Sequence, residues 1–315
     1  MALGIQPEER VAIASGTRVE WILADLAVMA AGGATTTVYP TTMAEDVAYI
    51  LADSDSKVVF AEDDEQVAKL REKHSELPSI AKVVVFDGTT DGDWVISFDE
   101  LEALGAKYLA DHPTAVDERV AATTKDSLAT LIYTSGTTGR PKGVRLAHDG
   151  WVYEGSVMVA AGILSEDDLQ FLWLPMAHSF GKVLLSTQLA IGFATAIDGR
   201  VPRIVDNLAV VRPTFMGAAP RIFEKAYGRI VGMTEAEGGV SSRSSSGPRR
   251  SVSRTRGRSA PASPSRRCSR RSTPSPTSSC SPRCATVSAA GCASSSGVLP
   301  PCRPTSPSGS MRPAS

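Results

Sequence analysis

The chain has 315 residues, of which 42% are hydrophobic and 21% are charged, and its formal net charge is −1. The near-neutral total hides two unlike parts, because residues 1–240 carry 20 basic and 34 acidic side chains, whereas residues 241–315 carry 13 arginines and no lysine, aspartate or glutamate. Residues 1–240 contain no cysteine, so they need no disulfides and fit a reducing, cytoplasmic compartment. No signal peptide is visible, and no stretch reaches the ~20 apolar residues of a membrane span.

Short apolar runs alternate with helical patterns along the first half of the chain. Strands are predicted at residues 11–14, 34–38, 57–61, 80–86 and 128–133, with helices at 18–31, 42–54, 63–74 and 98–109 between them. Thr42 and Glu45 have the spacing of a capping box at the start of the second helix, and residues 113–125 are predicted to be a polar connection. This alternation predicts the α/β class, with a parallel, doubly wound sheet and flanking helices.

The pattern continues to about residue 239. Strands are predicted at residues 144–147, 169–173, 194–197 and 214–217, and helices at 149–161, 182–191, 203–210 and from 220 onward. Asp149 is a candidate cap for the first of these helices, and Pro220 stands in the favoured first position of the last. His74 and His148 have no motif around them and are predicted to lie on the surface.

One polar stretch follows the strand at residues 128–133. Residues 133–143 read YTSGTTGRPKG and combine four serine or threonine hydroxyls, three glycines and one lysine. Glycines let the backbone approach phosphate oxygens, hydroxyls donate hydrogen bonds to them, and a lysine adds a mobile positive charge. The stretch is not the P-loop of nucleotide hydrolases, which needs a Ser or Thr after its lysine and then a helix. The alternative is a polar hairpin without a ligand, since Gly and Thr are common in turns.

Residues 133–143 resemble the signature loop of the adenylate-forming enzymes, which include acyl-CoA synthetases, luciferases and peptide-synthetase adenylation domains. Four further segments resemble long-chain acyl-CoA synthetases in particular: TRVEW (17–21), VYPT (38–41), LPMAHSFG (174–181) and PRIFEK (220–225). The resemblance runs in order from about residue 3 to about residue 239, so residues 3–239 are expected to be part of the large N-terminal, AMP-binding domain of that family.

The resemblance implies an ATP-dependent activation of a fatty acid in two steps. The carboxylate attacks the α-phosphate of ATP to give an acyl-adenylate and pyrophosphate, and coenzyme A then displaces AMP; Mg²⁺ accompanies the nucleotide. The expected partners are therefore fatty acid, ATP and CoA, with peripheral membrane contact compatible with such a substrate. The residues implied to bind the ATP phosphates are Thr134, Ser135, Gly136, Thr137, Thr138, Gly139 and Lys142. No residue is assigned to a metal.

His178 is the candidate catalytic residue. In the family, the matching histidine lies beside the carboxylate and the adenylate. The alternative is a histidine held by hydrogen bonds at a junction between strand and helix. The intact segment 174–181 favours the first interpretation. Arg221 follows the proline of PRIFEK and is either a phosphate ligand or an exposed arginine at a helix start.

Residues 240–315 have 24 serines and all five cysteines of the chain, and they lack isoleucine, phenylalanine, tyrosine and tryptophan. Such a composition cannot bury a core, so a disordered tail is predicted. We expect it to be an out-of-frame translation of a GC-rich gene, which translation of the DNA in the other two frames would test. No nucleic-acid partner is expected unless this Arg/Ser-rich tail is genuine, in which case its charge would attract phosphate backbones.

Several later segments of the family pattern are absent, including those for the ribose and the catalytic lysine. The sequence therefore predicts an incomplete N-terminal-domain fragment with little or no ligase activity. The alternative is a non-catalytic module that binds ATP or an acyl ligand without turnover.

Overall fold

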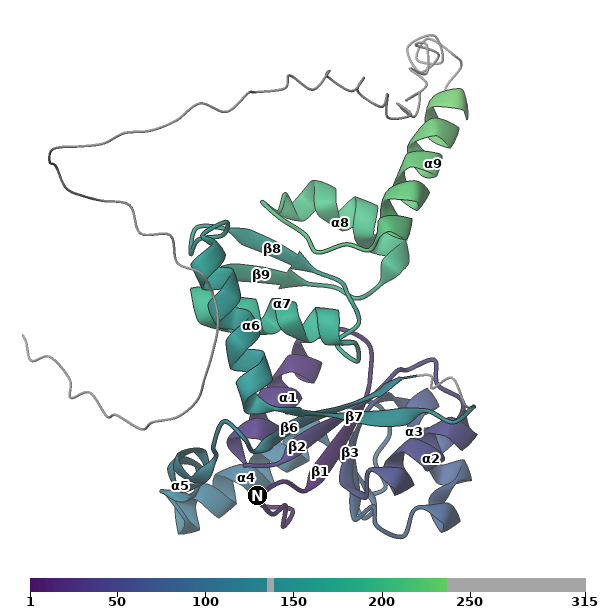
Figure 1. Ribbon diagram of the computed structural model, residues 1–315. Coiled ribbons are helices and arrows are strands. Elements are labelled where there is room, and N and C mark those ends of the chain that lie inside the picture. Colours follow the sequence, from purple (N-terminus) through teal and green to yellow (C-terminus); the bar gives the residue numbers. More distant parts are fainter. Residues whose placement is uncertain (135–138, 237–315) are drawn as a thin grey trace, which may run out of the picture. The chain divides into compact units, whose positions relative to one another are not determined.

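The computed structural model describes residues 1–134 and 139–236, and Figure 1 shows their helices and strands. All of these residues fall within one unit, Met1–Arg249. The predictions made for the loop residues 135–138 and for the tail 240–315 lie outside the described residues. Among the described residues, no helix combines the length and apolarity needed to cross a membrane.

The main sheet has seven strands in the order β5-β4-β3-β1-β2-β6-β7. Their bounds are β1 (Arg10–Ala14), β2 (Ala34–Val38), β3 (Ser56–Asp63), β4 (Lys82–Asp87), β5 (Val95–Ser97), β6 (Leu128–Thr134) and β7 (Lys142–Ala147). Every neighbouring pair is parallel except β6 and β7, which form an antiparallel hairpin. The predicted parallel, doubly wound sheet is therefore confirmed, with one antiparallel strand at its edge.

Helices cover both faces of this sheet. They are α1 (Val19–Ala30), α2 (Ala44–Asp53), α3 (Asp64–Glu72), α4 (Phe98–Asp111) and α5 (Ala115–Ala122), with the short 3₁₀ turn η1 (His74–Glu76) after α3. Side chains of one strand alternate between two cores, because successive residues of a strand point to opposite faces. In β1, Ala12 and Ala14 pack with α2 and α3, whereas Val11 and Ile13 pack with α1. Figure 1 shows α2 and α3 together on one side of β1 and β3.

A smaller part follows the hairpin. It contains α6 (His148–Ala161), β8 (Leu169–Leu172), α7 (Ser179–Ile191), β9 (Ala194–Ile197), η2 (Val201–Arg203), α8 (Ile204–Val211) and α9 (Pro220–Ala236). Strands β8 and β9 pair in parallel as a separate two-stranded sheet. Phe171 and Leu172 of β8 share one hydrophobic cluster with Trp21 and Ile22 of α1, so this part packs directly on the main sheet's helical layer.

Two predicted helix caps are wrong. Helix α2 begins at Ala44 after Met43, and its N-cap makes no side-chain hydrogen bond. Thr42 lies one residue earlier, where its N–H donates to the Tyr39 carbonyl in a turn. Helix α6 begins at His148 after Ala147, which places Asp149 inside the first turn. A shift of the N-cap by one residue in α2 and by two residues in α6 was enough, because a cap must precede the first helical residue.

Two predictions of secondary structure also need correction, and one short strand was missed. The connection predicted at residues 113–125 contains the helix α5, which lies against α1 and was missed because it is polar and buries none of its residues. The strand predicted at residues 214–217 makes only one isolated bridge, from Phe215 to Gln170. Strand β5 was not predicted, since its three residues are too short for a period-2 pattern to show.

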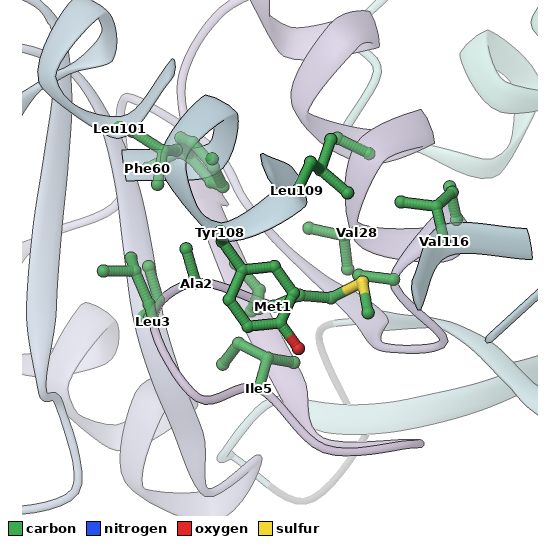
Figure 2. A pocket seen from close by; sticks show the side chains of 16 residues that line it. Met1, Ala2, Leu3, Ile5, Val28, Phe60, Leu101, Tyr108, Leu109 and Val116 are labelled. Atoms are coloured by element: carbon green, nitrogen blue, oxygen red, sulfur yellow. The ribbon is translucent and has the colours of Figure 1, made fainter. Parts of the chain in front are cut away.

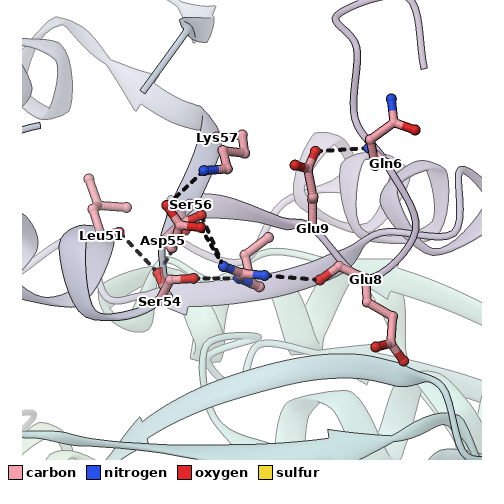
Figure 3. Close-up of polar contacts among 9 residues, drawn as sticks. Gln6, Glu8, Glu9, Leu51, Ser54, Asp55, Ser56 and Lys57 are labelled. Carbon is pink, nitrogen blue, oxygen red and sulfur yellow. Dashed lines mark hydrogen bonds and ion pairs between the residues drawn. The ribbon is translucent and has the colours of Figure 1, made fainter. Parts of the chain in front are cut away.

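Arg10 joins the start of β1 to the turn between α2 and β3, and Figure 3 shows Ser54, Asp55 and Lys57 of this turn. Its guanidinium donates to the Ser54 carbonyl, and Nη2 lies 2.9 Å from Asp55 Oδ2. Lys57 Nζ donates to the other oxygen of Asp55 at 2.7 Å. Asp55 adopts a φ of +50°, a conformation that Asp tolerates better than most residues. The ion pair between Arg10 and Asp55 therefore lies at the amino end of β1, which is opposite to the carboxyl ends of the strands.

Candidate functional site

The carboxyl ends of β1, β2 and β6 lie at one edge of the parallel sheet, where ligands of open α/β sheets usually bind. Hydrogen bonds tie these ends to the segment after β8. Thr17, after β1, donates from Oγ1 to the Leu174 carbonyl at 2.7 Å and accepts from the Met176 N–H at 3.1 Å. Thr37 of β2 donates from its buried hydroxyl to the Ala177 carbonyl at 3.1 Å. The segment leading to His178 is thereby fixed at this edge.

His178 caps α7. Its backbone is extended, and Nδ1 accepts a hydrogen bond from the Phe180 N–H at 3.2 Å. The accepting role assigns the ring proton of a neutral histidine to Nε2. A close backbone approach shapes this turn, because a Cβ on Gly181 would lie only 2.5 Å from the Pro175 carbonyl oxygen. His178 is exposed, so the two interpretations from sequence are compatible: Nδ1 is used structurally while the rest of the ring faces outward.

The two ends of the signature stretch lie in the antiparallel hairpin strands β6 and β7. Tyr133 stands opposite Gly143, and Thr134 stands opposite Lys142. A Cβ on Gly143 would lie 2.9 Å from Cζ of Tyr133, so only glycine leaves room for this ring. The antiparallel pairing of β6 and β7 is compatible with both interpretations of this stretch, a phosphate-binding loop and a polar hairpin without a ligand.

Helix α2 contacts one residue of β6 and one residue just before β7. Tyr133 Oη donates to Asp53 Oδ2 at 2.6 Å, and burial together with this carboxylate raises the pKa of the tyrosine above its usual range. The Arg140 guanidinium lies over the ring of Tyr49, 5.1 Å from its centroid. Tyr49 and Asp53 are four residues apart and therefore lie on one face of α2.

A cavity of about 540 Å³ separates the hairpin from His178. Its wall includes Thr134 and Pro141 of the hairpin on one side and His178 with Ser179 on the other. The remaining wall comes from the end of β2 and the start of α2, with Thr37, Tyr39, Thr41, Thr42, Met43, Asp46 and Ile50, and from Ile132 and Tyr133 of β6. The cavity therefore connects the two predicted halves of the site.

Three of the seven predicted phosphate ligands lie among the described residues. Thr134 and Lys142 are exposed at paired positions of the hairpin. Gly139 has a φ of +105°, a conformation open mainly to glycine. Ser135, Gly136, Thr137 and Thr138 lie outside the described residues. Arg221 is exposed in the first turn of α9.

A family model for AMP-binding enzymes matches residues 1–273, most of the chain. The chain belongs to the AMP-binding enzyme family. The match includes the hairpin, the cavity and His178, and it extends past residue 239, the predicted end of the domain. That boundary stays a prediction.

Curated relatives of this AMP-binding enzyme include fatty-acid ligases. Long-chain-fatty-acid–CoA ligase FadD15 of Mycobacterium tuberculosis is 34% identical over 233 residues, which cover 72% of this chain and 37% of that protein. Fatty acyl-CoA synthetase A of Dictyostelium discoideum is 30% identical over 236 residues, which cover 72% of this chain and 34% of that protein. The chain thus spans about a third of the length of these relatives.

Solved structures share the fold of this AMP-binding enzyme. The anthranilate CoA ligase AuaEII, in complex with anthranoyl-AMP, superimposes with a TM-score of 0.59 at 20% identity, covering 70% of this chain and 42% of that one. The long-chain-fatty-acid–CoA ligase FadD1 of Archaeoglobus fulgidus gives a TM-score of 0.55 at 19% identity, covering 70% and 42%. At such identities the likeness establishes the fold alone.

Sequence reasoning missed a buried polar cluster behind the hairpin of this AMP-binding enzyme. Lys182 Nζ lies 2.9 Å from Asp25 Oδ1 and donates to Thr130 Oγ1 at 2.7 Å. The two charged side chains are 3% and 0% exposed. His148, predicted to lie on the surface, is half-buried and lines a cavity of about 340 Å³ together with Lys182 and Asp25. The one signal in the sequence was Asp25, an acidic residue inside an apolar helix.

A separate, apolar cavity of about 330 Å³ lies under α4 (Figure 2). Its wall includes Leu3 and Ile5 of the N-terminal segment, Val28 of α1, and Leu101 and Leu109 of α4. None of the residues assigned to the site lines it. Within the described ranges, no group of three or more His, Cys, Asp or Glu side chains is arranged to hold a metal ion.

Proposed function

We propose that this chain forms the nucleotide- and acid-binding part of an ATP-dependent fatty acid–CoA ligase. The observation that carries the proposal is the cavity at the carboxyl edge of the sheet, bounded by the signature hairpin on one side and by His178 on the other. When the carboxylate of a fatty acid reacts with the α-phosphate of ATP, the two substrates together would have to contact both the hairpin and the His178 side of the cavity. The long-chain-fatty-acid–CoA ligases among the relatives support this choice of substrate.

In this proposal the hairpin holds the β- and γ-phosphates, and therefore the departing pyrophosphate. Lys142 supplies a positive charge at the hairpin, and Thr134, Ser135, Thr137 and Thr138 supply hydroxyl donors. Gly136 and Gly139 allow the backbone N–H groups to turn toward the phosphates. The transfer of an adenylyl group depends mainly on such positioning and charge stabilisation.

His178 lies on the acid side of the proposed site. Because Nδ1 is occupied by the Phe180 N–H, Nε2 is the ring atom that remains to donate toward a carboxylate or an acyl-adenylate oxygen. Mg²⁺ would arrive with the phosphates and neutralise part of their charge, a mode that needs few protein ligands. Coenzyme A would serve as the acceptor of the acyl group.

Titration with ATP and Mg²⁺ tests the nucleotide half of the proposal. Lys142→Ala removes an exposed charge-assisted donor, so we expect ATP affinity to fall by on the order of tenfold without a change in thermal stability. Lys107→Ala, at an exposed position of α4, is the matched control and is expected to bind like the wild type. Equal affinities in all three proteins would contradict the proposal.

Turnover is a separate question. A chain that binds ATP and a fatty acid without forming acyl-AMP or acyl-CoA would be a binding module, the alternative from the sequence. Incubation with a radiolabelled fatty acid, ATP and CoA, followed by separation of the products, distinguishes the two. Formation of acyl-AMP or acyl-CoA would establish ligase activity for this chain, whereas binding of both substrates without product would support the binding module.

A further inference from the structure

The buried contact between Asp25 and Lys182 brings together three elements that are far apart in the sequence. Asp25 lies on α1, Lys182 on α7 and Thr130 on β6. The Lys182 ammonium donates to both of the other residues, at 2.9 Å and 2.7 Å. Thr130 Oγ1 also accepts from Trp151 Nε1 of α6 at 3.2 Å. One ammonium group therefore joins the helices α1 and α7 to strand β6.

Stability alone is a poor explanation for this pair. Removing two charges from water is expensive, and hydrophobic replacements of buried ion pairs are often neutral or stabilising. Asp25 Oδ2 is buried without a hydrogen-bond partner among the described residues, which adds to the free-energy cost of burying the pair. The rings of Trp21 and Trp151 flank the ammonium at 5.8 and 5.1 Å, and their attraction offsets part of that cost. Because burying this ion pair costs free energy, its role is better explained as holding α1, α7 and β6 in a fixed arrangement.

The position of the pair in the fold identifies what it fixes. Lys182 lies one turn after His178, and its N–H donates to the His178 carbonyl. Thr130 precedes Thr134 by four residues on β6, so both side chains leave the same face of the strand. The ammonium thus connects the helix that His178 caps to the strand that leads into the hairpin. Both of these elements form walls of the 540 Å³ cavity.

We propose that Lys182, held by Asp25, is a positioning residue that fixes the distance between His178 and the hairpin of β6 and β7. This inference rests on the proposed function, because it assumes a ligand that spans both walls of the cavity. An acyl-adenylate keeps only the α-phosphate and carries the acyl group, so its acyl-phosphate linkage would lie between the hairpin and His178, whereas ATP alone would bind mainly through its β- and γ-phosphates at the hairpin. Loss of the ion pair should therefore weaken binding of an acyl-adenylate more than binding of ATP.

The test compares two ligands on the full 315-residue chain by calorimetric titration: ATP with Mg²⁺, and a non-hydrolysable acyl-sulfamoyl analogue of the acyl-adenylate. The double variant Asp25→Asn/Lys182→Met removes both charges without leaving one unpaired. We expect its affinity for the analogue to fall by on the order of tenfold to a hundredfold, the effect of a small misplacement in a site. Its affinity for ATP should stay within about threefold of the wild type.

Two further variants keep the test decisive. Lys182→Arg retains the charge and should restore the affinity for the analogue. Thr130→Val keeps both charges, removes the acceptor on β6 that Lys182 and Trp151 share, and should also lower that affinity, which provides a second test if the double variant does not fold. The matched control is Arg10→Met/Asp55→Asn, which removes the ion pair at the opposite edge of the sheet. It should alter thermal stability without changing the ratio of the two affinities.

The outcomes separate the inference from the proposed function. If the wild type binds neither ligand, the proposed function is wrong, and the inference that depends on it is wrong as well. If the wild type binds both, and the Asp25/Lys182 and Thr130 variants keep the wild-type ratio of affinities, the positioning role is wrong while the proposed function stands. A fall in both affinities by the same factor would likewise reduce the pair to a structural role.

Discussion

Tyr133 Oη donates a 2.6 Å hydrogen bond to Asp53 Oδ2, and this contact joins the last buried residue of β6 to the end of α2. Asp53 is eighty positions earlier in the chain. Since Gly143 leaves space for the tyrosine ring from the opposite strand, the ring is enclosed between helix and hairpin. The position of the end of β6 therefore depends on α2 as well as on its pairing with β7.

Tyr133→Phe should reduce both stability and nucleotide binding. It removes one hydrogen bond to a charged acceptor, which is worth about 1.5–3 kcal/mol. We expect urea denaturation to show a loss at the lower end of that range, because Asp53 can recruit water. ATP affinity should fall along with it. A variant with the stability of the wild type would mean that the hydroxyl and Asp53 do not interact in solution.

Gly181→Ala should destabilise the turn that carries His178. The added Cβ would lie 2.5 Å from the Pro175 carbonyl oxygen, and backbone cannot move aside as a side chain would. We expect a loss of about 1–3 kcal/mol, the usual range for overpacking, and weaker binding of the acyl-adenylate analogue.

Gly105→Ala is the matched control for that substitution. It lies inside α4, where an added Cβ meets nothing within 4 Å. Because alanine is the better helix former, its stability should rise by about 0.5–1 kcal/mol. Similar effects of the two substitutions would contradict the close approach at Gly181.

Lys182→Met alone should be far more harmful than its combination with Asp25→Asn. The single variant leaves a fully buried carboxylate without its partner, and breaking a buried pair in this way costs about 3–5 kcal/mol. In the double variant no charge is left unpaired, so most of that loss should be recovered. Thermal unfolding of the two variants and of Asp25→Asn completes a double-mutant cycle, and additive effects would show that the pair does not interact.

His148 should make the stability depend on pH near neutrality. Burial, and secondly the Lys182 ammonium, lower the pKa of His148 below 6.5 in the folded chain. The folded state therefore favours the neutral ring, and its contribution is fully present above about pH 6.5. It is lost as the pH falls from there toward the lower folded pKa. Denaturation by urea at several pH values should show this loss in the wild type and a smaller one in His148→Gln.

The alternation of apolar and polar residues was sufficient to predict most of this fold. Strand β2 has the predicted bounds, because a buried parallel strand is a short run of β-branched and apolar residues between two turns. Helix starts were harder. At Thr42 and Asp149 the capping residue types were present, but the first helical turn begins at a neighbouring residue, and propensity alone cannot decide between such alternatives.

The site was predictable only where it is local in sequence. The hairpin and the turn at His178 each lie within one short segment, so a motif could indicate them. The Asp25–Lys182 pair joins residues 157 positions apart, and nothing near either residue specifies its partner. An acidic residue such as Asp25 within an apolar helix is a signal that could have pointed to a buried partner, since buried carboxylates are rarely left alone. The sequence did not indicate which residue this is.

Thr17 illustrates what such long-range contacts mean for how the molecule is assembled. Its hydroxyl bonds to the Leu174 carbonyl, again across 157 positions. A synthetic fragment that begins at residue 128 would contain the signature hairpin, His178 and Lys182, yet it would lack the side chain that holds the histidine segment in place. The parts that resemble an active site are therefore not self-sufficient, and in the folding reaction their final arrangement has to wait until the N-terminal strand has docked.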